Sequence, residues 1–151
     1  NIGGIRKIVI PLDGSSESEQ VIPHIAQLAA TLKAEVVLFQ AISLAYPTYT
    51  ADAFAYVTYS DNQTDAMKAS ALDYLAKTGA TLKEKGVKTS YEVRFGSAAD
   101  EIINFSDEIN ADLVAMTTHG RSGLGRWLFG STAARILKGG NSNLLIVRIQ
   151  S

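Results

Sequence analysis

Glycines and arginines gather in one stretch of this 151-residue chain. Gly120, Gly123, Gly125 and Gly130 are interleaved with Arg121 and Arg126, and Ser131 closes the stretch as a candidate N-cap. An apolar run precedes it at 113–116, and a helical pattern follows it to residue 138. A strand, a glycine-rich basic loop and a helix N-terminus are, in this order, the parts with which a backbone holds phosphate. The stretch therefore predicts binding of a phosphate or a nucleotide.

Competing motifs do not fit the spacing of this loop. The chain has no G-x-x-x-x-G-K-[S/T] sequence, which excludes a P-loop. The spacing here is G-x-x-G-x-G, whereas the dinucleotide fingerprint is G-x-G-x-x-G and follows the first strand. Ser122 lacks the G-x-S-x-G spacing of a hydrolase nucleophile elbow, so that catalytic use of Ser122 with His119 is not expected.

Composition narrows the class of protein. With 46% apolar and 19% charged residues, the chain is expected to form one globular domain over 1–151. A net charge of -1 argues against a nucleic-acid partner, and no apolar run is long enough for a membrane span. The absence of cysteine excludes thiolate catalysis and Cys-based zinc sites, and two histidines make no metal cluster. Without a visible signal peptide, the expected location is the cytoplasm.

Strand and helix patterns alternate along the chain. Apolar runs predict five strands, at 7–12, 35–42, 89–95, 113–116 and 143–149. Apolar residues at helical spacing predict four helices between them, and the alternating character of 89–95 places that strand nearer a sheet edge. Short right-handed crossovers then give an α/β fold, a doubly wound five-stranded parallel sheet in the order 3-2-1-4-5 with helices on both faces.

Capping patterns predict where two of the helices begin. Ser16 with Glu19 has the form of a capping box at the start of the first helix. Ser97 with Asp100 has the same form at the start of the third.

The alternation breaks at 43–64, where aromatic side chains lie among small polar residues. A segment of this length is either a surface excursion, or a lid or dimer contact. A helix is expected after it at 65–85, weakened at Gly79. Residues 1–4 are expected to form a frayed N-terminus.

The predicted topology places a site where the strand order reverses. In doubly wound sheets, ligands bind beyond the carboxyl ends of the strands at that point. In the order 3-2-1-4-5 the reversal falls between the first strand, which ends at Asp13, and the fourth, which runs into the glycine loop. Asp13 fits a turn or capping role as well as a ligand role. Two features found independently along the chain therefore meet at one edge of the sheet.

These residues also carry a family resemblance. The segments IVIPLDGSSESEQ (8–20), THGRSGLGRWLFGSTAARIL (118–137) and NLLIVRI (143–149) resemble the universal stress protein family, and the resemblance covers essentially the whole chain. ATP-binding members carry G-x-x-G, nine residues and then G-[S/T]. Here Gly120 matches the second glycine and Gly130 with Ser131 completes the motif, while Thr117 occupies the first glycine position.

The resemblance implies a Rossmann-like fold and a bound adenine nucleotide, ATP or AMP, with Mg2+ accompanying the nucleotide near Asp13. The adenosine end would lie against Pro11, Leu12, Asp13, Ala41, Met116 and Thr117. The phosphates would lie against His119, Gly120, Arg121, Gly123, Gly130, Ser131 and Thr132.

The resemblance further implies a stress-response protein that forms a homodimer through the strand at 143–149. An apolar edge strand of this kind is an aggregation hazard unless it is paired, which agrees with that expectation. The nucleotide would serve as a regulatory ligand, and the protein would not be an enzyme. Two alternatives stay open: a slow ATPase, and a dimeric interaction module that binds no nucleotide and works through 43–64.

Overall fold

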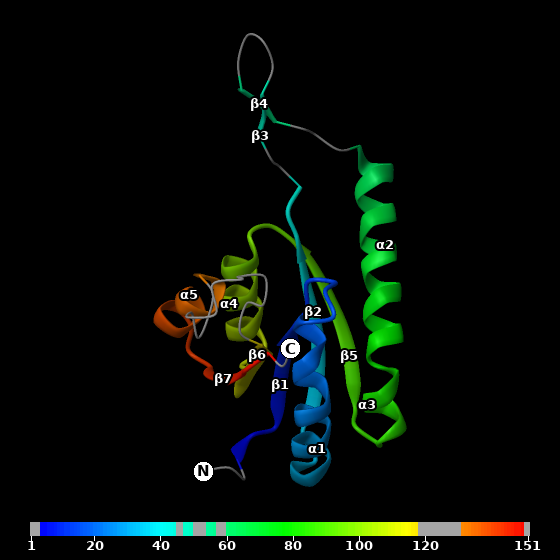
Figure 1. Ribbon diagram of the computed structural model, residues 1–151, viewed down its shortest axis with the longest axis vertical. Helices are drawn as coiled ribbons and strands as arrows, with labels where there is room; N and C mark the ends of the chain where they lie inside the picture. Colours follow the sequence, from blue (N-terminus) through cyan, green and yellow to red (C-terminus); the bar gives the residue numbers. More distant parts are fainter. Residues whose placement is uncertain (1–3, 45–46, 50–53, 57–59, 118–130, 150–151) are drawn as a thin grey trace.

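The computed structural model describes residues 4–44, 47–49, 54–56, 60–117 and 131–149. Five strands form one parallel sheet in the order β5-β2-β1-β6-β7 (Figure 1). Their bounds are β1 Lys7–Pro11, β2 Glu35–Ile42, β5 Thr89–Phe95, β6 Leu113–Thr117 and β7 Asn143–Val147. This confirms the predicted fold, the order 3-2-1-4-5 and the edge position of 89–95.

Helices cover both faces of the sheet. Three of them, α1 (Ile22–Leu32), α2 (Asp61–Thr78) and α3 (Ala80–Glu84), lie on one face (Figure 1). The other face is covered by α4 (Ala98–Glu108) and α5 (Ser131–Gly139). We call these the α1/α2 face and the α4/α5 face.

The central strand β1 supplies side chains to two separate cores. Ile8 and Ile10 belong to the cluster under α1 and α2, whereas Val9 belongs to the cluster under α4 and α5, and all three are 0% exposed. In the second cluster the ring of Phe39 stacks on that of Phe105, with centroids 5.1 Å apart. Burial on both faces explains why this strand reads as a continuous apolar run.

A carboxylate fixes the amino end of β6 against β1. Asp112 Oδ2 accepts hydrogen bonds from the backbone N–H groups of Arg6 (2.9 Å) and Lys7 (3.0 Å). The backbone N–H of Asp112 donates to the carbonyl of Lys7 at 2.9 Å. These bonds set the register in which Ile8 pairs with Leu113, and hence the level at which the two strands end.

The predicted capping box of Ser16 and Glu19 is wrong. A 3-10 turn, η2 (Ser18–Val21), comes first, and α1 begins at Ile22 with Val21 at its N-cap and no side-chain cap. The Glu19 N–H instead donates to the backbone carbonyl of Ser16 at 3.2 Å, which closes a tight turn. The hydroxyl of Ser16, which the predicted cap would need, donates instead to Glu17 Oε1 at 3.5 Å.

The predicted capping box of Ser97 and Asp100 is wrong as well, although α4 does begin directly after Ser97. The Ser97 hydroxyl donates to Asp100 Oδ2 at 2.8 Å and makes no bond to the backbone of the first turn. Asp100 also pairs with Arg135 of α5. A contact between two helices therefore takes the place of the local cap.

The helix predicted at 65–85 is two helices. The first, α2, begins at Asp61 because Ser60 and Gln63 form a capping box, with bonds of 3.2 Å and 2.7 Å. It ends at Thr78 with Gly79 as its C-cap, and α3 follows. A Cβ at Gly79 would lie 2.9 Å from Leu38 Cδ1. The break thus lies where the backbone approaches the sheet too closely for a side chain.

Segment 43–64 contains secondary structure that the sequence did not indicate. Two short strands, β3 (Pro47–Tyr49) and β4 (Phe54–Tyr56), form an antiparallel pair beyond the carboxyl end of β2 (Figure 1). The last residues of the segment, 61–64, belong to α2. Whether 43–64 acts as a lid or a dimer contact stays a prediction.

Replacing Phe39 by alanine should lower the free energy of unfolding by about 3–5 kcal/mol, because the change leaves a cavity where the ring packs on Phe105. Denaturant titration followed by circular dichroism measures this loss. The matched control is Lys88→Ala, whose side chain is 84% exposed and should change the stability by less than about 0.5 kcal/mol. Equal stability of the two variants would contradict the central position of Phe39.

Candidate functional site

The carboxyl ends of the five strands lie at one edge of the sheet because all neighbours are parallel. From β1 the chain proceeds to β2 and β5 on one side, and later to β6 and β7 on the other. The strand order therefore reverses between β1 and β6. This is the position at which doubly wound folds bind ligands.

The loop after β1 is ordered by a network of serine hydroxyls around Asp13. Asp13 Oδ1 accepts hydrogen bonds from Ser15, at 2.9 Å from the backbone N–H and 2.5 Å from the hydroxyl. Ser18 N–H donates to Ser15 Oγ at 3.1 Å, and the Ser18 hydroxyl donates to the Ser15 carbonyl at 2.8 Å. Gly14 has φ +89, which side chains rarely allow, so the turn needs a glycine there.

The same network controls the charge of Asp13. Partial burial raises the pKa of the carboxyl group, but the hydrogen bonds from Ser15, from Ser18 and from the backbone N–H of Asp13 together lower it by more. The pKa of Asp13 therefore lies below its ordinary value of 3.8. At neutral pH this exposed side chain is a fixed carboxylate beside the switch point.

Three of the predicted site residues share the α4/α5 face at the carboxyl edge. Ala41 and Met116 pack against the cluster of that face and remain partly exposed. Pro11 pairs with Phe39, whose side chain is in the same cluster, so Pro11 faces the same way. The predicted neighbours Leu12 and Asp13 follow directly, and Leu12 N–H donates to the carbonyl of Phe39 at 2.8 Å.

Thr117 is turned to the opposite face. It is 8% exposed and pairs with Val147, which packs against the cluster under α1 and α2. Ala115, two residues earlier on the strand, lies in that cluster as well. The Thr117 side chain is therefore directed away from the face of Ala41 and Met116.

The start of α5 provides the remaining described residues. The described part of α5 begins with Ser131, the predicted N-cap, followed by Thr132. The first N–H groups of a helix have no acceptor within the helix and attract anions. The predicted loop residues His119, Gly120, Arg121, Gly123 and Gly130 lie outside the described residues.

Sequence reasoning missed the roles of Ser15 and Ser18. They lie two and five residues after Asp13, and an Asp followed by a serine two residues later is a common local hydrogen-bonding pattern. Gln40 and Tyr74, which lie near this loop on the α1/α2 face, carried no sequence signal at all.

Metal-ligating side chains do not cluster in the described part of the chain. No group of three or more His, Asp or Glu side chains there could hold an ion. Asp13, the predicted Mg2+ contact, therefore offers a single carboxylate, and an ion at this position would need nucleotide phosphates as further ligands.

No helix within the described residues is long and apolar enough to cross a membrane.

Sequence comparison identifies the family. The profile of the universal stress protein family matches residues 4–148, nearly the whole chain. This chain belongs to the universal stress protein family. It is 32% identical over 148 residues to the universal stress protein MJ0531 of Methanocaldococcus jannaschii, a match that covers 95% of this chain and 82% of the relative.

Solved structures share the fold. The chain is similar to protein MJ0577 of Methanocaldococcus jannaschii, with a TM-score of 0.75, 19% identity and 97% coverage of both chains. It also resembles a universal stress protein in complex with cAMP, at a TM-score of 0.66 and 21% identity over 97% of this chain and 98% of that one. A family protein of Arabidopsis thaliana with AMP bound is similar at a TM-score of 0.62 and 13% identity, and the match covers 97% of this chain and 93% of that one.

Removing the Ser15 hydroxyl should raise the pKa of Asp13 toward 3.8, because Ser15→Ala deletes the shorter of the two bonds to Oδ1. Ionised Asp13 stabilises the fold above the pKa it has in the unfolded chain, and this stabilisation is lost as the pH falls through the lowered folded value. A 13C titration of the Asp13 carboxyl measures its folded pKa in the unchanged protein and in Ser15→Ala.

Ser16→Ala is the control for this titration, because the Ser16 hydroxyl bonds to Glu17 at 3.5 Å and leaves Asp13 untouched. If both variants titrate as the unchanged protein does, the assigned network does not hold the carboxylate.

Proposed function

We propose that the carboxyl edge between β1 and β6 binds an adenine nucleotide as a regulatory ligand. The observation that carries the proposal is the meeting of Pro11, Ala41 and Met116 on one face, beside the ionised Asp13, at the point where the strand order reverses. Family membership and relatives with cAMP or AMP bound support the ligand class.

The chemistry of these residues suits an adenosine. Small and flexible apolar side chains such as Ala41 and Met116 leave room for a flat base and contact its faces. A carboxylate that is held in place, as Asp13 is by Ser15, accepts hydrogen bonds from ribose hydroxyls.

The orientation of Thr117 removes an obstacle to this proposal. The family motif has a glycine at this position, where a side chain toward the ligand would block the approach of the backbone. Thr117 pairs with Val147 and is buried on the α1/α2 face. A threonine is thus compatible with a nucleotide on the other face.

Phosphates would extend toward the start of α5. The backbone N–H groups of Ser131 and Thr132 lie at the positive end of the helix dipole, and their hydroxyls supply further donors. The glycine loop, including Gly120 and Gly130, would complete this cradle. Mg2+ would bind between the phosphates and Asp13.

A ligand role is favoured over catalysis. Hydrolysis of ATP needs a positioned water, a base and stabilisation of charge at the γ-phosphate. Asp13 is the candidate base among the described site residues, and its lowered pKa makes it a weak one. Slow ATP hydrolysis is therefore the second candidate activity.

A homodimer through β7 is part of the proposal. This strand lies at the edge of the sheet, and Leu144, Leu145, Ile146 and Val147 are each only partly buried in a single chain. Leu137 on the neighbouring α5 is 61% exposed. Pairing of two β7 edges would cover apolar surface that one chain leaves in water.

Identification of the nucleotide carried by the purified protein separates the alternatives. The protein is denatured and the released small molecules are analysed by chromatography. ATP or AMP in the supernatant supports the ligand role, and ADP that accumulates from added ATP supports the ATPase. A protein that releases nothing, and whose melting temperature ATP with magnesium does not change, would be the interaction module.

Replacing Ala41 by phenylalanine should weaken AMP binding by roughly tenfold or more, about 1.4 kcal/mol, because the ring fills the space assigned to the base. Isothermal titration calorimetry measures the affinity. The matched control is Ile42→Phe, in which the same ring is added one residue later, on the opposite face. If Ile42→Phe lost AMP binding and Ala41→Phe kept it, the nucleotide would lie on the α1/α2 face, which would contradict the proposal.

Replacing Leu137 by glutamate should shift the protein from dimer to monomer without unfolding it, because the side chain is exposed in a single chain. Sedimentation velocity gives the oligomeric state, and circular dichroism checks the fold. Lys138→Glu changes the charge of the adjacent exposed position and serves as control. A dimer unaffected by Leu137→Glu would show that this part of α5 does not contribute to the interface.

A further inference from the structure

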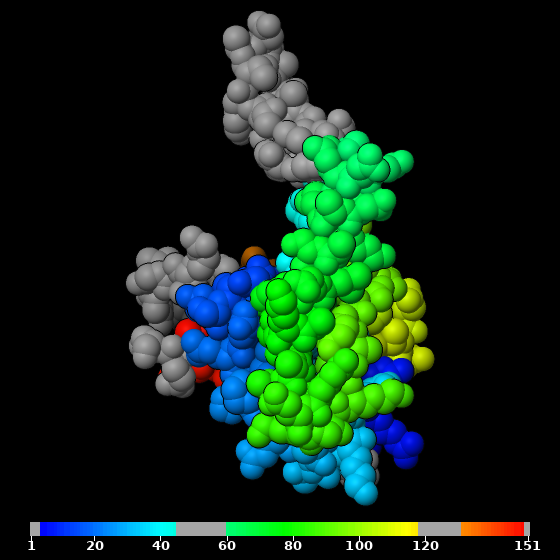
Figure 2. Space-filling view, turned by 90° about the vertical axis from the view of Figure 1, so that its right-hand side faces the viewer, coloured from blue at the N-terminus to red at the C-terminus, as the bar shows by residue number. Residues whose placement is uncertain are grey.

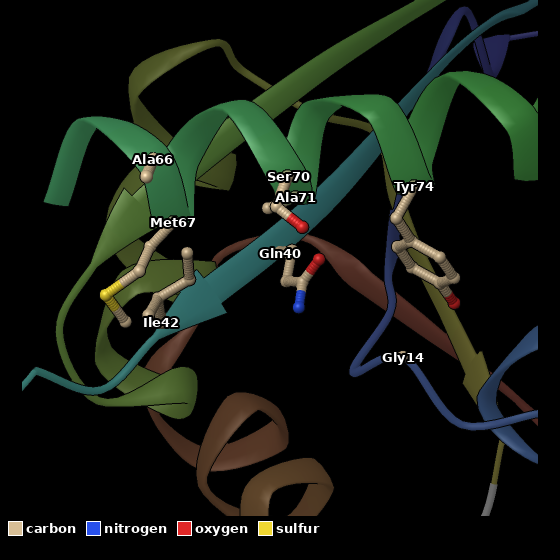
Figure 3. A pocket seen from close by; sticks show the side chains of 8 residues that line it. All are labelled: Gly14, Gln40, Ile42, Ala66, Met67, Ser70, Ala71 and Tyr74. Atoms are coloured by element: carbon tan, nitrogen blue, oxygen red, sulfur yellow. The ribbon is translucent and has the colours of Figure 1, made fainter. Parts of the chain in front are cut away.

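A cavity lies on the α1/α2 face, between α2 and the carboxyl end of β2 (Figure 3). In the space-filling view, α2 and α3 run in green down the front of the molecule and cover this face (Figure 2). The cavity is widely open to solvent, and its volume is about 470 Å³. Its lining consists of Gly14, Gln40, Ile42, Ala66, Met67, Ser70, Ala71 and Tyr74.

Gln40, which lines the cavity, carries an unsatisfied hydrogen-bonding group. Gln40 Oε1 is buried and accepts no hydrogen bond in the described structure. A buried amide oxygen in this state is unfavourable, and a donor brought to it removes that penalty. The last torsion of a glutamine side chain is soft, so the amide can turn toward a donor in the adjacent space (Figure 3).

Tyr74 forms a fixed wall of the cavity. Its hydroxyl donates to Glu19 Oε2 at 2.7 Å, which ties α2 to η2. Burial and the Glu19 carboxylate raise the pKa of Tyr74 to about 12, so the phenol stays protonated and this bond persists at neutral pH. The wall on which a ligand would lie is thus already in place.

The rest of the lining is apolar or neutral. The side chains of Met67 and Ile42 point toward each other at one end of the cavity (Figure 3), and Ala71 is buried. No lining residue carries a charge. A phosphate would find no cationic partner in this lining, which favours a neutral ligand.

We propose that this cavity binds a neutral small molecule with an apolar body and one N–H or O–H donor, which bonds to Gln40 Oε1. The site is separate from the nucleotide site, because Gln40 and Ala41 are consecutive on β2 and face opposite sides of the sheet. Gly14 lines the cavity and follows Asp13, so the two sites share the loop after β1.

Indole and benzofuran form a matched pair of probes, because they have the same shape and only indole carries an N–H. The full chain, labelled with 15N, is titrated with each probe, and the Gln40 side-chain amide is followed by NMR. Indole should shift the resonances of the cavity lining in a saturable manner and bind about fivefold more tightly than benzofuran, the effect of one neutral hydrogen bond.

Gln40→Met should reduce the affinity for indole by about fivefold while leaving that for benzofuran unchanged, because it keeps the length of the side chain and removes its acceptor. Gln27→Met makes the same change at an exposed position of α1 and should change neither affinity. Equal binding of the two probes, an unchanged indole affinity in Gln40→Met, or no saturable shift would each overturn the proposal. AMP affinity in the same samples reports on the nucleotide site independently.

Discussion

Burial of β1 on both faces is the constraint on which the rest of the structure depends. Ile8, Val9 and Ile10 are fully removed from water, and burying each such side chain contributes about 1.5–3 kcal/mol. A strand enclosed in this way needs a helical layer on each side and a hydrogen-bonded neighbour at each edge. Once β2 and β6 take those places in parallel, the carboxyl ends of all three strands must lie together. The site is thus a consequence of the core.

Much of this arrangement could be predicted from sequence because it depends on patterns that a single strand or helix carries by itself. Continuous apolar runs specify strands buried on both faces, and short connections allow few topologies. The helix starts were harder to predict because hydroxyl groups have competing acceptors. The hydroxyl of Ser97 satisfies Asp100, which in turn pairs with Arg135, a residue that lies far along the chain. No local pattern contains that information.

The position of the candidate site was predictable as well, because it follows from the strand order and from the alternation of side chains along each strand. Topology alone brings Asp13 and β6 to one edge, and strand alternation places Ala41 and Met116 on one face of it. The state of Asp13 was not predictable, since its lowered pKa depends on how the loop folds Ser15 back onto the carboxylate. Thr117 shows the same limit, because the motif reveals that a glycine is replaced but not that the threonine side chain faces α1 and α2.

Strand alternation has one more consequence for β2. Consecutive residues of a strand face opposite sides, so one strand end can contribute to two sites that never touch. Ala41 lies on the face of the proposed nucleotide site, and Gln40 lines the uncharged cavity beneath α2. Both sites contact the loop of Asp13 and Gly14, whose shape is set by serine hydroxyls and by the bond between Tyr74 and Glu19. Because Asp13 and Gly14 are adjacent, this loop is the part of the chain that the two proposed sites would share.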